Sequence, residues 1–357
     1  MKRFIWLVAV FIGLFCATGE AQIETRWIDS SQTAIKRELG IFFTNRKPVL
    51  DPDGEVLSFR NRWIRQTSSL YFCRYDYETD SVYPKYVATK TCSKKRFPTE
   101  PVDHNFFYQV YRDLRIENGI KNFVFIIPGH SKTFDKQLED YMFRVQRSYA
   151  DSLVSAAFIT FAWSSESIGP LYWRGQRAAD ASSNYFSIFQ HMLETFMTDS
   201  AFWEKNPKDI SIKLICTSMG NELLRRYLIK REYQGIPLVP VYDRIILIGS
   251  DAPADAFRKG EGFDHLLEMC NNGILVLVNR RDGPLTLSQF MNLEGRMGRS
   301  GPINWSTLPE EIVVRDVTHL ISREDLGALG HDYFLRNSTL MDFILHQELS
   351  SELPGEL

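Results

Sequence analysis

Ser218 is the residue whose neighbours in the sequence most clearly suggest chemistry. A short, mostly apolar run, residues 213–217, leads into it, and a helical pattern over residues 222–230 follows it. Small residues, Cys216 and Gly220, stand two positions before and two positions after it, as a crowded strand-to-helix turn requires. The pattern predicts a nucleophile elbow, in which a serine hydroxyl is exposed at the edge of a parallel sheet. The alternative is a serine that only caps a helix, because glycine is usual where Cys216 stands.

A serine hydroxyl is a weak nucleophile at neutral pH, so it needs a histidine to accept its proton and a carboxylate to orient that histidine. Two later aspartates are candidates for the carboxylate: Asp251 follows the apolar run 244–250, and Asp282 follows the run 273–279. Both fall at the carboxyl ends of predicted strands, where open α/β sheets gather functional groups. We expect Asp282 to be the acid because its loop is rich in turn residues, and Asp251 is the alternative.

Four histidines follow Ser218 in the chain. His265 and His346 fall in helical patterns, and His319 follows a strand-like run. His331 lies in a glycine-bearing loop just before the last helical pattern. Because such a loop can reach over the carboxyl edge of a sheet, we expect His331 to be the base and treat His319 as the weaker candidate.

A tetrahedral acyl intermediate carries a negatively charged oxygen, which two backbone N–H groups can stabilise. The N–H of Met219, directly after the serine, is the first candidate. The second is the N–H of His130, which follows the strand-like run 122–127 and a turn at Gly129. The alternative is that Gly129 makes an ordinary turn and His130 is solvated.

The elements that must position these residues alternate between strands and helices. Strand-like runs at 123–127 and 156–163 are interleaved with helical patterns at 134–148 and 175–197, and the run that precedes the serine comes next. Such alternation predicts the α/β class, with a mostly parallel sheet and helices on both of its faces.

Composition divides the chain into four predicted segments. The part after the leader is polar, aromatic and turn-rich, which predicts a β-rich extension packed on the core, with a hairpin-like turn at 51–54 between the runs 41–44 and 59–64. The stretch 288–307, rich in Gly and Asn, is interpreted as a lid or rim over the site, or as a simple loop. The segments are a signal peptide (1–21), the N-terminal extension (22–118), the α/β catalytic domain (119–350) and a C-terminal tail (351–357).

Taken together, these stretches resemble the α/β-hydrolase superfamily, in particular an uncharacterised, mostly bacterial branch of serine esterase- and lipase-like domains. The likeness lies in Ile-Ile-Pro-Gly-His at 126–130, Phe-Ala-Trp-Ser-Ser at 161–165 and Cys-Thr-Ser-Met-Gly-Asn at 216–221. It extends to residues 249–257, 279–285 and 295–298, so that it covers about two thirds of the chain. The resemblance implies an α/β-hydrolase fold, with Ser218 as nucleophile, Asp282 as acid and His331 as base.

Two positions depart from that branch, because Pro128 and Thr217 stand where it has histidines. Neither is a triad residue, so we expect a serine hydrolase that cleaves carboxylic esters through an acyl-enzyme. The alternatives are an acyltransferase and a non-catalytic binding or envelope protein of the same fold. No metal or cofactor is expected, and the substrate is expected to be a small-molecule or lipid-like ester.

The composition agrees with a globular enzyme. The chain has 357 residues, of which 44% are hydrophobic and 24% charged, as is ordinary for folded domains. A formal net charge of −2 gives no electrostatic reason to expect nucleic acid. The sequence is compatible with membrane association but does not imply it.

The first residues indicate export. A positive start, residues 1–3, precedes an apolar run at 4–17 that is too short to span a bilayer comfortably, and Gly19-Glu-Ala21 offers a small-x-small cleavage site. These features predict a cleaved signal peptide and a periplasmic or extracellular protein. The alternatives are an uncleaved membrane anchor and a lipid anchor at Cys16, which the preceding Phe15 disfavours.

Export makes disulfide bonds chemically feasible. Cys73 and Cys92 lie on or just after two strand-like runs that we expect to be neighbours, so a disulfide between them is predicted. Cys216 and Cys270 are expected to stay reduced and buried.

Overall fold

The computed structural model describes residues 40–50, 52, 56–60, 69–76, 81–89, 105–130, 133–138, 140, 156–165, 172–303, 305–322, 331–335 and 337–346. The predicted signal peptide, Cys92 and the C-terminal tail lie outside these residues. Among the helices of the described ranges, none combines the length and the apolarity that crossing a membrane would need.

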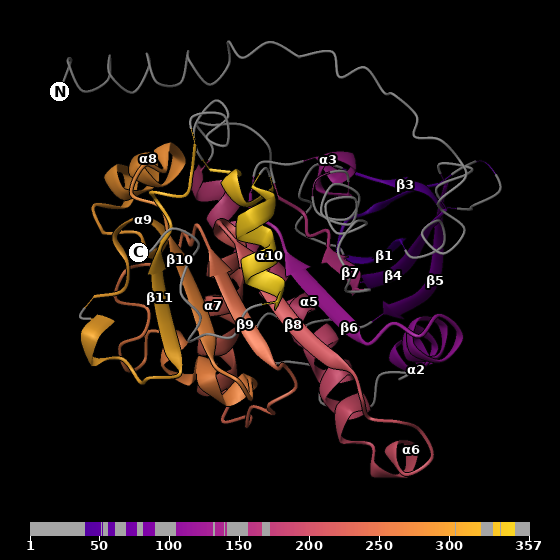
Figure 1. Ribbon diagram of the computed structural model, residues 1–357. Helices are drawn as coiled ribbons and strands as arrows, with labels where there is room; N and C mark the ends of the chain where they lie inside the picture. Colours follow the sequence, from indigo (N-terminus) through magenta and orange to yellow (C-terminus); the bar gives the residue numbers. More distant parts are fainter. Residues whose placement is uncertain are drawn as a thin grey trace.

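Nine strands of the described residues form one sheet (Figure 1). Six neighbouring pairs are parallel, and the two pairs at one edge are antiparallel. From the parallel edge to the antiparallel edge, the strands are β11 (Ile312–Asp316), β10 (Ile274–Val278), β9 (Arg244–Ile248), β8 (Ser211–Thr217), β6 (Asn122–Ile127), β7 (Ala156–Phe161), β1 (Gly40–Thr44), β4 (Ser69–Asp76) and β5 (Ser81–Thr89).

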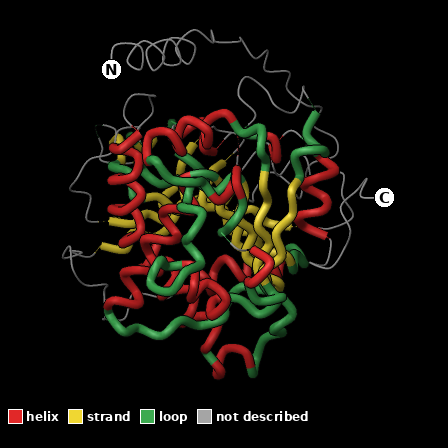
Figure 2. Tube along the Cα trace, turned by 90° about the vertical axis from the view of Figure 1, so that its left-hand side faces the viewer, coloured by secondary structure: helices red, strands yellow, loops and turns green. Residues whose placement is uncertain are grey.

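The helices cover both faces of this sheet, as Figure 2 shows from the side. Those named below are α2 (Asn105–Tyr111), α3 (Phe134–Leu138), α5 (Tyr172–Thr198), α6 (Ser200–Trp203), α7 (Met219–Tyr233), α8 (Gly283–Asn292), α9 (Met297–Ser300) and α10 (Ser338–His346). The remaining short helical turns are η2 (Arg112–Glu117), η5 (Phe263–Met269), η6 (Trp305–Thr307) and η7 (Tyr333–Leu335).

Alternate residues of the central strands pack on opposite faces, as the two-residue period of a strand requires. In β6, Phe123 and Phe125 belong to a core that includes residues of α2, α5 and α7. The residues between and after them, Val124 and Ile126, pack in a second core with residues of α10. Because both faces are covered, β10 is buried throughout its Ile-Leu-Val-Leu-Val run. The predicted α/β architecture, a mostly parallel sheet with helices on both faces, is confirmed.

The N-terminal strands belong to this same sheet. β1 pairs in parallel with β7 and antiparallel with β4, and the ring of Phe43 stacks on Phe161 and on Phe189 of α5, at centroid distances of 4.6 and 4.0 Å. A hairpin does flank the turn predicted at 51–54, because β2 (Pro48–Leu50) and β3 (Val56–Phe59) pair antiparallel in a small separate sheet. The run at 41–44, predicted as its first strand, is instead β1 of the large sheet. The run at 41–44 is apolar on both faces, and it is therefore buried within the large sheet.

The stretch 288–307 is more ordered than its composition suggests. It contains the second half of α8 and all of α9 and η6, so a simple loop is the wrong interpretation for most of it. Gly298, the second residue of α9, donates its N–H to the carbonyl oxygen of Ser250, and a Cβ at this position would lie 2.6 Å from the Cα of Gly249. Glycine is needed here because it lets α9 pack directly on the end of β9.

The predicted disulfide is also wrong, because Cys73 is a free, buried thiol. In the β4–β5 hairpin Cys73 lies opposite Pro84, whereas Thr89, the last residue of β5, pairs with Ser69. The second strand therefore leads away from Cys73 before the chain comes to Cys92. Cys73 packs instead in an apolar cluster with Phe42 and Phe59. Cys216 and Cys270 are free and buried, as expected.

Candidate active site

Ser218 stands at the turn between β8 and α7 in a strained backbone conformation, with φ 51° and ψ −125°. Positive φ is rare for residues other than glycine and costs on the order of 1–3 kcal/mol. Backbone hydrogen bonds stabilise the turn: the N–H of Ser218 donates to Ile248 O at 3.0 Å, and its carbonyl oxygen accepts from the N–H groups of Asp251 and Asn221, both at 3.1 Å. The strain is therefore held in place by the ends of two strands and the first turn of a helix.

The amide side chain of Asn221, the last residue of the 216–221 motif, adds to this support, a role that the sequence analysis did not predict. It is fully buried, and its Nδ2 donates to the carbonyl oxygen of Ser218 at 3.0 Å and to that of Cys216 at 3.2 Å. An asparagine at this position of the helix thus fixes the carbonyls on both sides of the turn.

Two glycines allow the close approaches that the turn requires. A Cβ on Gly220 would lie 2.7 Å from Pro128 O and closer still to the carbonyl oxygen of Ile127. A Cβ on Gly129 would lie 2.7 Å from the Cβ of Ser218. The turn after β6 therefore lies directly against the serine, and α7 begins against the end of β6.

His331 connects Ser218 to Asp282. Its Nε2 lies 2.7 Å from Oγ of Ser218, and its Nδ1 lies 2.7 Å from Oδ2 of Asp282. The three side chains named from the sequence therefore form one continuous hydrogen-bonded chain, although they stand up to 113 residues apart.

The charges around His331 determine its protonation. Burial lowers the pKa of the imidazole, but the negative charge of Asp282 and its hydrogen bond raise it more, and the charges of Asp332 and Asp251 add to that effect. The net result raises the pKa of His331 from 6.5 to about 9. The imidazolium form is therefore strongly stabilised at this position.

Asp282 has two structural tasks because each of its oxygens accepts a different hydrogen bond. Oδ2 faces His331, and Oδ1 accepts from the N–H of Leu285 at 2.9 Å and so caps the first turn of α8. The carboxylate is completely buried. The hydrogen bond that caps α8 therefore fixes the orientation of the Asp282 carboxylate toward His331.

Asp251, the alternative acid, has other partners. Its carboxylate accepts a hydrogen bond from the hydroxyl of Tyr172 at 2.8 Å and a short one from Ser288 Oγ, and it lies 3.8 Å from Nε of Arg296. Burial raises the pKa of Asp251 to about 6, against the opposing charge of Arg296. The structure therefore brings Asp282, and not Asp251, into hydrogen-bonding contact with the imidazole.

The two candidate oxyanion donors belong to the two turns that meet at Ser218. Met219 is the first residue of α7, and His130 follows the Gly129 turn, whose Pro128 carbonyl accepts a hydrogen bond from Trp163 Nε1 at 2.7 Å. The imidazole of His130 is packed against α5, because a Cβ on Gly175 would lie 2.5 Å from its Nε2. Burial lowers the pKa of His130 to about 4, so the ring is neutral at pH 7. His130 as a whole is half-buried, and its Nε2 is enclosed, so the ring packs against α5 and does not extend freely into solvent.

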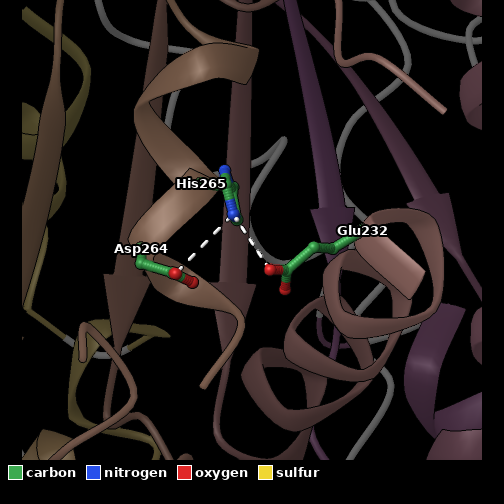
Figure 3. Close-up of side chains that lie close together, drawn as sticks. All are labelled: Glu232, Asp264 and His265. Carbon is green, nitrogen blue, oxygen red and sulfur yellow. Dashed lines mark ion pairs between the residues drawn. The ribbon is translucent and has the colours of Figure 1, made fainter. Parts of the chain in front are cut away.

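The other histidines lie elsewhere. His319 is exposed in the turn after β11, and the side chain of His346 is outside the described residues. His265, on η5, forms with Glu232 and Asp264 the group shown in Figure 3, which has the composition of a cation site. Its Nε2 lies 3.4 Å from Glu232 and 3.6 Å from Asp264. This group is partly exposed and includes the end of α7 remote from Ser218, so it has no part in the arrangement described above.

Comparisons with known proteins agree with this fold. The model of a family described as "Alpha/beta hydrolase of unknown function (DUF900)" matches residues 109–348, about two thirds of the chain. The search of curated proteins found no match.

Similar solved structures are related only distantly. TT1662 from Thermus thermophilus is 11% identical with a TM-score of 0.31, over 65% of this chain and 91% of that one. An esterase/lipase from an uncultured bacterium is 13% identical with a TM-score of 0.27, over 62% and 76% of the two chains. A fungal esterase from Rhizomucor miehei is 11% identical with a TM-score of 0.28, over 92% and 89%. At these TM-scores the likeness has no bearing on activity.

Proposed function

Because the chain belongs to the family described as alpha/beta hydrolase of unknown function, we propose that it is a serine hydrolase that cleaves carboxylic esters through an acyl-enzyme. The observation that carries the proposal is the 2.7 Å distance between Nε2 of His331 and Oγ of Ser218. A hydroxyl at this distance from a neutral imidazole nitrogen can pass its proton to that nitrogen as it attacks a carbonyl carbon.

In the acylation step, Ser218 Oγ forms a bond to the acyl carbon while Nε2 of His331 takes the hydroxyl proton. The tetrahedral intermediate then expels the alcohol, which receives that same proton from Nε2. Asp282 supports both transfers, because a carboxylate at Nδ1 keeps the neutral ring protonated on Nδ1 and leaves Nε2 as the acceptor.

The oxyanion that forms in this step needs donors that are already in place. The N–H groups of Met219 and His130 are the proposed pair. The close contact of Gly129 with Ser218 supports this assignment, because it brings the turn that carries His130 to the nucleophile.

In the second half of the reaction, a water molecule attacks the acyl carbon while Nε2 of His331 takes one of its protons. The second tetrahedral intermediate then breaks the bond to Ser218 Oγ, which receives that proton from Nε2, and the carboxylic acid leaves. If an alcohol or amine attacks in place of water, the same residues perform acyl transfer. We propose hydrolysis of small-molecule or lipid-like esters as the main reaction. We also propose that the protein is exported by its N-terminal leader and acts in the periplasm or outside the cell.

The proposal is tested with purified protein and a panel of p-nitrophenyl esters of increasing acyl length. His331→Ala is the variant that should lose activity, by a factor of ~10³ or more if the base is essential. His319→Ala is the matched control, since it removes an exposed histidine and should retain the wild-type rate.

The outcomes separate the alternatives. Turnover by wild type that is lost in His331→Ala and kept in His319→Ala supports the proposal. Faster release of p-nitrophenol when methanol is added, with methyl ester as product, would indicate a transferase. A folded wild type that hydrolyses no ester of the panel would favour the non-catalytic binding protein, in which Pro128 and Thr217 accompany a loss of turnover.

A further inference from the structure

We propose that Asp251 is a positioning residue, which holds the two sides of the oxyanion hole in a fixed relation through its backbone N–H and its carboxylate. This inference depends on the proposed function. It assigns a role to the residue that the sequence offered as the rival acid and that the hydrogen-bonded chain of Ser218, His331 and Asp282 does not use.

On the first side, Asp251 controls the direction of the Met219 N–H. The backbone N–H of Asp251 donates to the carbonyl oxygen of Ser218 at 3.1 Å. That carbonyl and the N–H of Met219 belong to one planar peptide unit and point in opposite directions. A bond that fixes the oxygen therefore also fixes the donor at the other end of the unit. Because Ser218 has a positive φ, this peptide would otherwise relax toward a commoner conformation.

On the second side, the carboxylate of Asp251 controls the start of α5. The hydroxyl of Tyr172, the first residue of that helix, donates to Oδ2 of Asp251 at 2.8 Å. Three residues later, Gly175 packs against the imidazole of His130. The position of the first turn of α5 therefore determines where His130, the proposed second donor, can lie.

The carboxylate can serve as an anchor because it is itself held firmly. It is 4% exposed, and its Oδ1 accepts a short hydrogen bond from Ser288. Arg296 donates from Nη1 to the backbone oxygen of Asp251 at 3.1 Å and lies with Nε 3.8 Å from Oδ1. Each oxygen of the Asp251 carboxylate thus has a hydroxyl donor, and the loss of one of these donors leaves a desolvated acceptor unpaired.

Further bonds connect Tyr172 to α8. Its hydroxyl oxygen lies 2.8 Å from Ser288 Oγ and accepts from Nδ2 of Asn292 at 3.1 Å, and Nε2 of Gln176 donates to Asn292 at 3.2 Å. Asp251 thus joins three elements at one point: the elbow, the start of α5 and α8, the helix that Asp282 caps.

The test compares Tyr172→Phe with Tyr108→Phe. Both changes remove one hydroxyl that donates to an aspartate, since Tyr108 of α2 donates to Asp199 at 2.5 Å. α2 and α6, which follows Asp199, lie away from α8 and the site (Figure 1). The measurements are kcat and KM for a soluble short-chain p-nitrophenyl ester and the affinity for an alkylboronic acid, which forms a tetrahedral adduct with an active serine. Active enzyme is counted by fluorophosphonate titration.

We expect Tyr172→Phe to lower kcat by about 10-fold with KM within twofold, because a displaced donor loses part of the ~10²–10³-fold effect of a whole one. The affinity for the boronic acid should fall by about the same factor, since it too depends on oxyanion stabilisation. Tyr108→Phe should leave all three quantities within twofold of wild type. A second variant, Ser288→Ala, should give a change in the same direction as Tyr172→Phe.

If the wild type is active and Tyr172→Phe gives the same kcat and boronic acid affinity as Tyr108→Phe, this inference is overturned and the proposed function stands. A KM increase without a change in kcat or boronic acid affinity would also overturn it, because that result would indicate a role in substrate binding alone. A wild type without turnover or titratable serine would overturn the proposed function, and this inference with it.

Discussion

His331 and Asp282 are joined by a hydrogen bond of 2.7 Å between Nδ1 and Oδ2, and the second oxygen of the same carboxylate caps helix α8. One buried side chain therefore orients an imidazole and begins a helix. Because a single group serves both, a change at Asp282 should affect activity and stability by different amounts according to what replaces it.

Asp282→Asn should lower kcat by ~10³–10⁴-fold, because an amide has only one acceptor oxygen and cannot both cap α8 and accept from Nδ1–H. The thermal midpoint should fall less than in Asp282→Ala, which also loses the cap, worth about 1 kcal/mol. Steady-state kinetics and thermal melts measure the two effects.

The control for this prediction is Asp199→Asn. Asp199 caps α6 in the same way, through a hydrogen bond from the N–H of Phe202, but it has no contact with His331. Its substitution should leave kcat unchanged. Activity of Asp282→Asn within tenfold of wild type would show that the imidazole does not depend on this carboxylate.

The pH dependence of kcat/KM should reflect the raised pKa of His331. The imidazole must be neutral to accept a proton from Ser218, and its pKa is raised to about 9. Activity should therefore rise with pH through neutrality and level off only above about pH 9, provided that ester hydrolysis by buffer is subtracted. This profile reports the free enzyme.

Asp251→Asn should move that profile to lower pH. The charge of Asp251 is one of the influences that raise the pKa of His331, so its removal makes the imidazole easier to deprotonate. An apparent pKa near 6.5 in wild type, or no shift in Asp251→Asn, would contradict the electrostatic description of the site.

Gly220→Ala should damage the elbow. A methyl group here would meet the backbone carbonyls of Ile127 and Pro128, so α7 would have to move away from the end of β6. We expect a loss of ~10²-fold or more in kcat, because small displacements of reacting groups have effects of that size. Active-site titration and thermal melts distinguish a displaced serine from unfolding.

Gly235→Ala is the comparison for this change. Gly235 has a left-handed backbone conformation, with φ +64°, but a Cβ at this position would meet no atom within 4 Å. It should cost about 1 kcal/mol of stability from the left-handed backbone and leave kcat of the folded enzyme unchanged. A Gly220→Ala enzyme with wild-type kcat would mean that α7 tolerates the shift.

Much of the parallel sheet could be predicted from the sequence because its strands are covered on both faces. The runs that became β9 and β10 are apolar at almost every position, and that pattern needs no knowledge of partners. The same pattern places Asp251 and Asp282 at the carboxyl edge of the sheet, because each aspartate comes just after such a strand. Which of the two meets a histidine depends on the fold of distant loops, and the sequence left that choice open.

The features that could not be predicted depend on contacts between distant segments. β1 lies beside β7, more than 100 residues further along the chain, so its local pattern suggested a hairpin instead. The stretch 288–307 looks irregular in composition, yet it holds helices, one of which, α9, packs through Gly298 against the end of β9. The disulfide was wrong because strand register, and not proximity in sequence, decides which side chains meet.

The network around Asp251 was missed for a related reason. Tyr172, Ser288 and Arg296 come from three elements, and none of them has a local pattern that indicates a partner. Only the fold brings them to one carboxylate.

The most direct test of the account is covalent labelling of the purified protein by a fluorophosphonate probe. Intact mass should rise by one probe adduct in wild type, peptide mapping should place that adduct on Ser218, and Ser218→Ala should remain unlabelled. A correctly folded wild type that takes up no probe, or takes it up equally well in Ser218→Ala, would contradict the account.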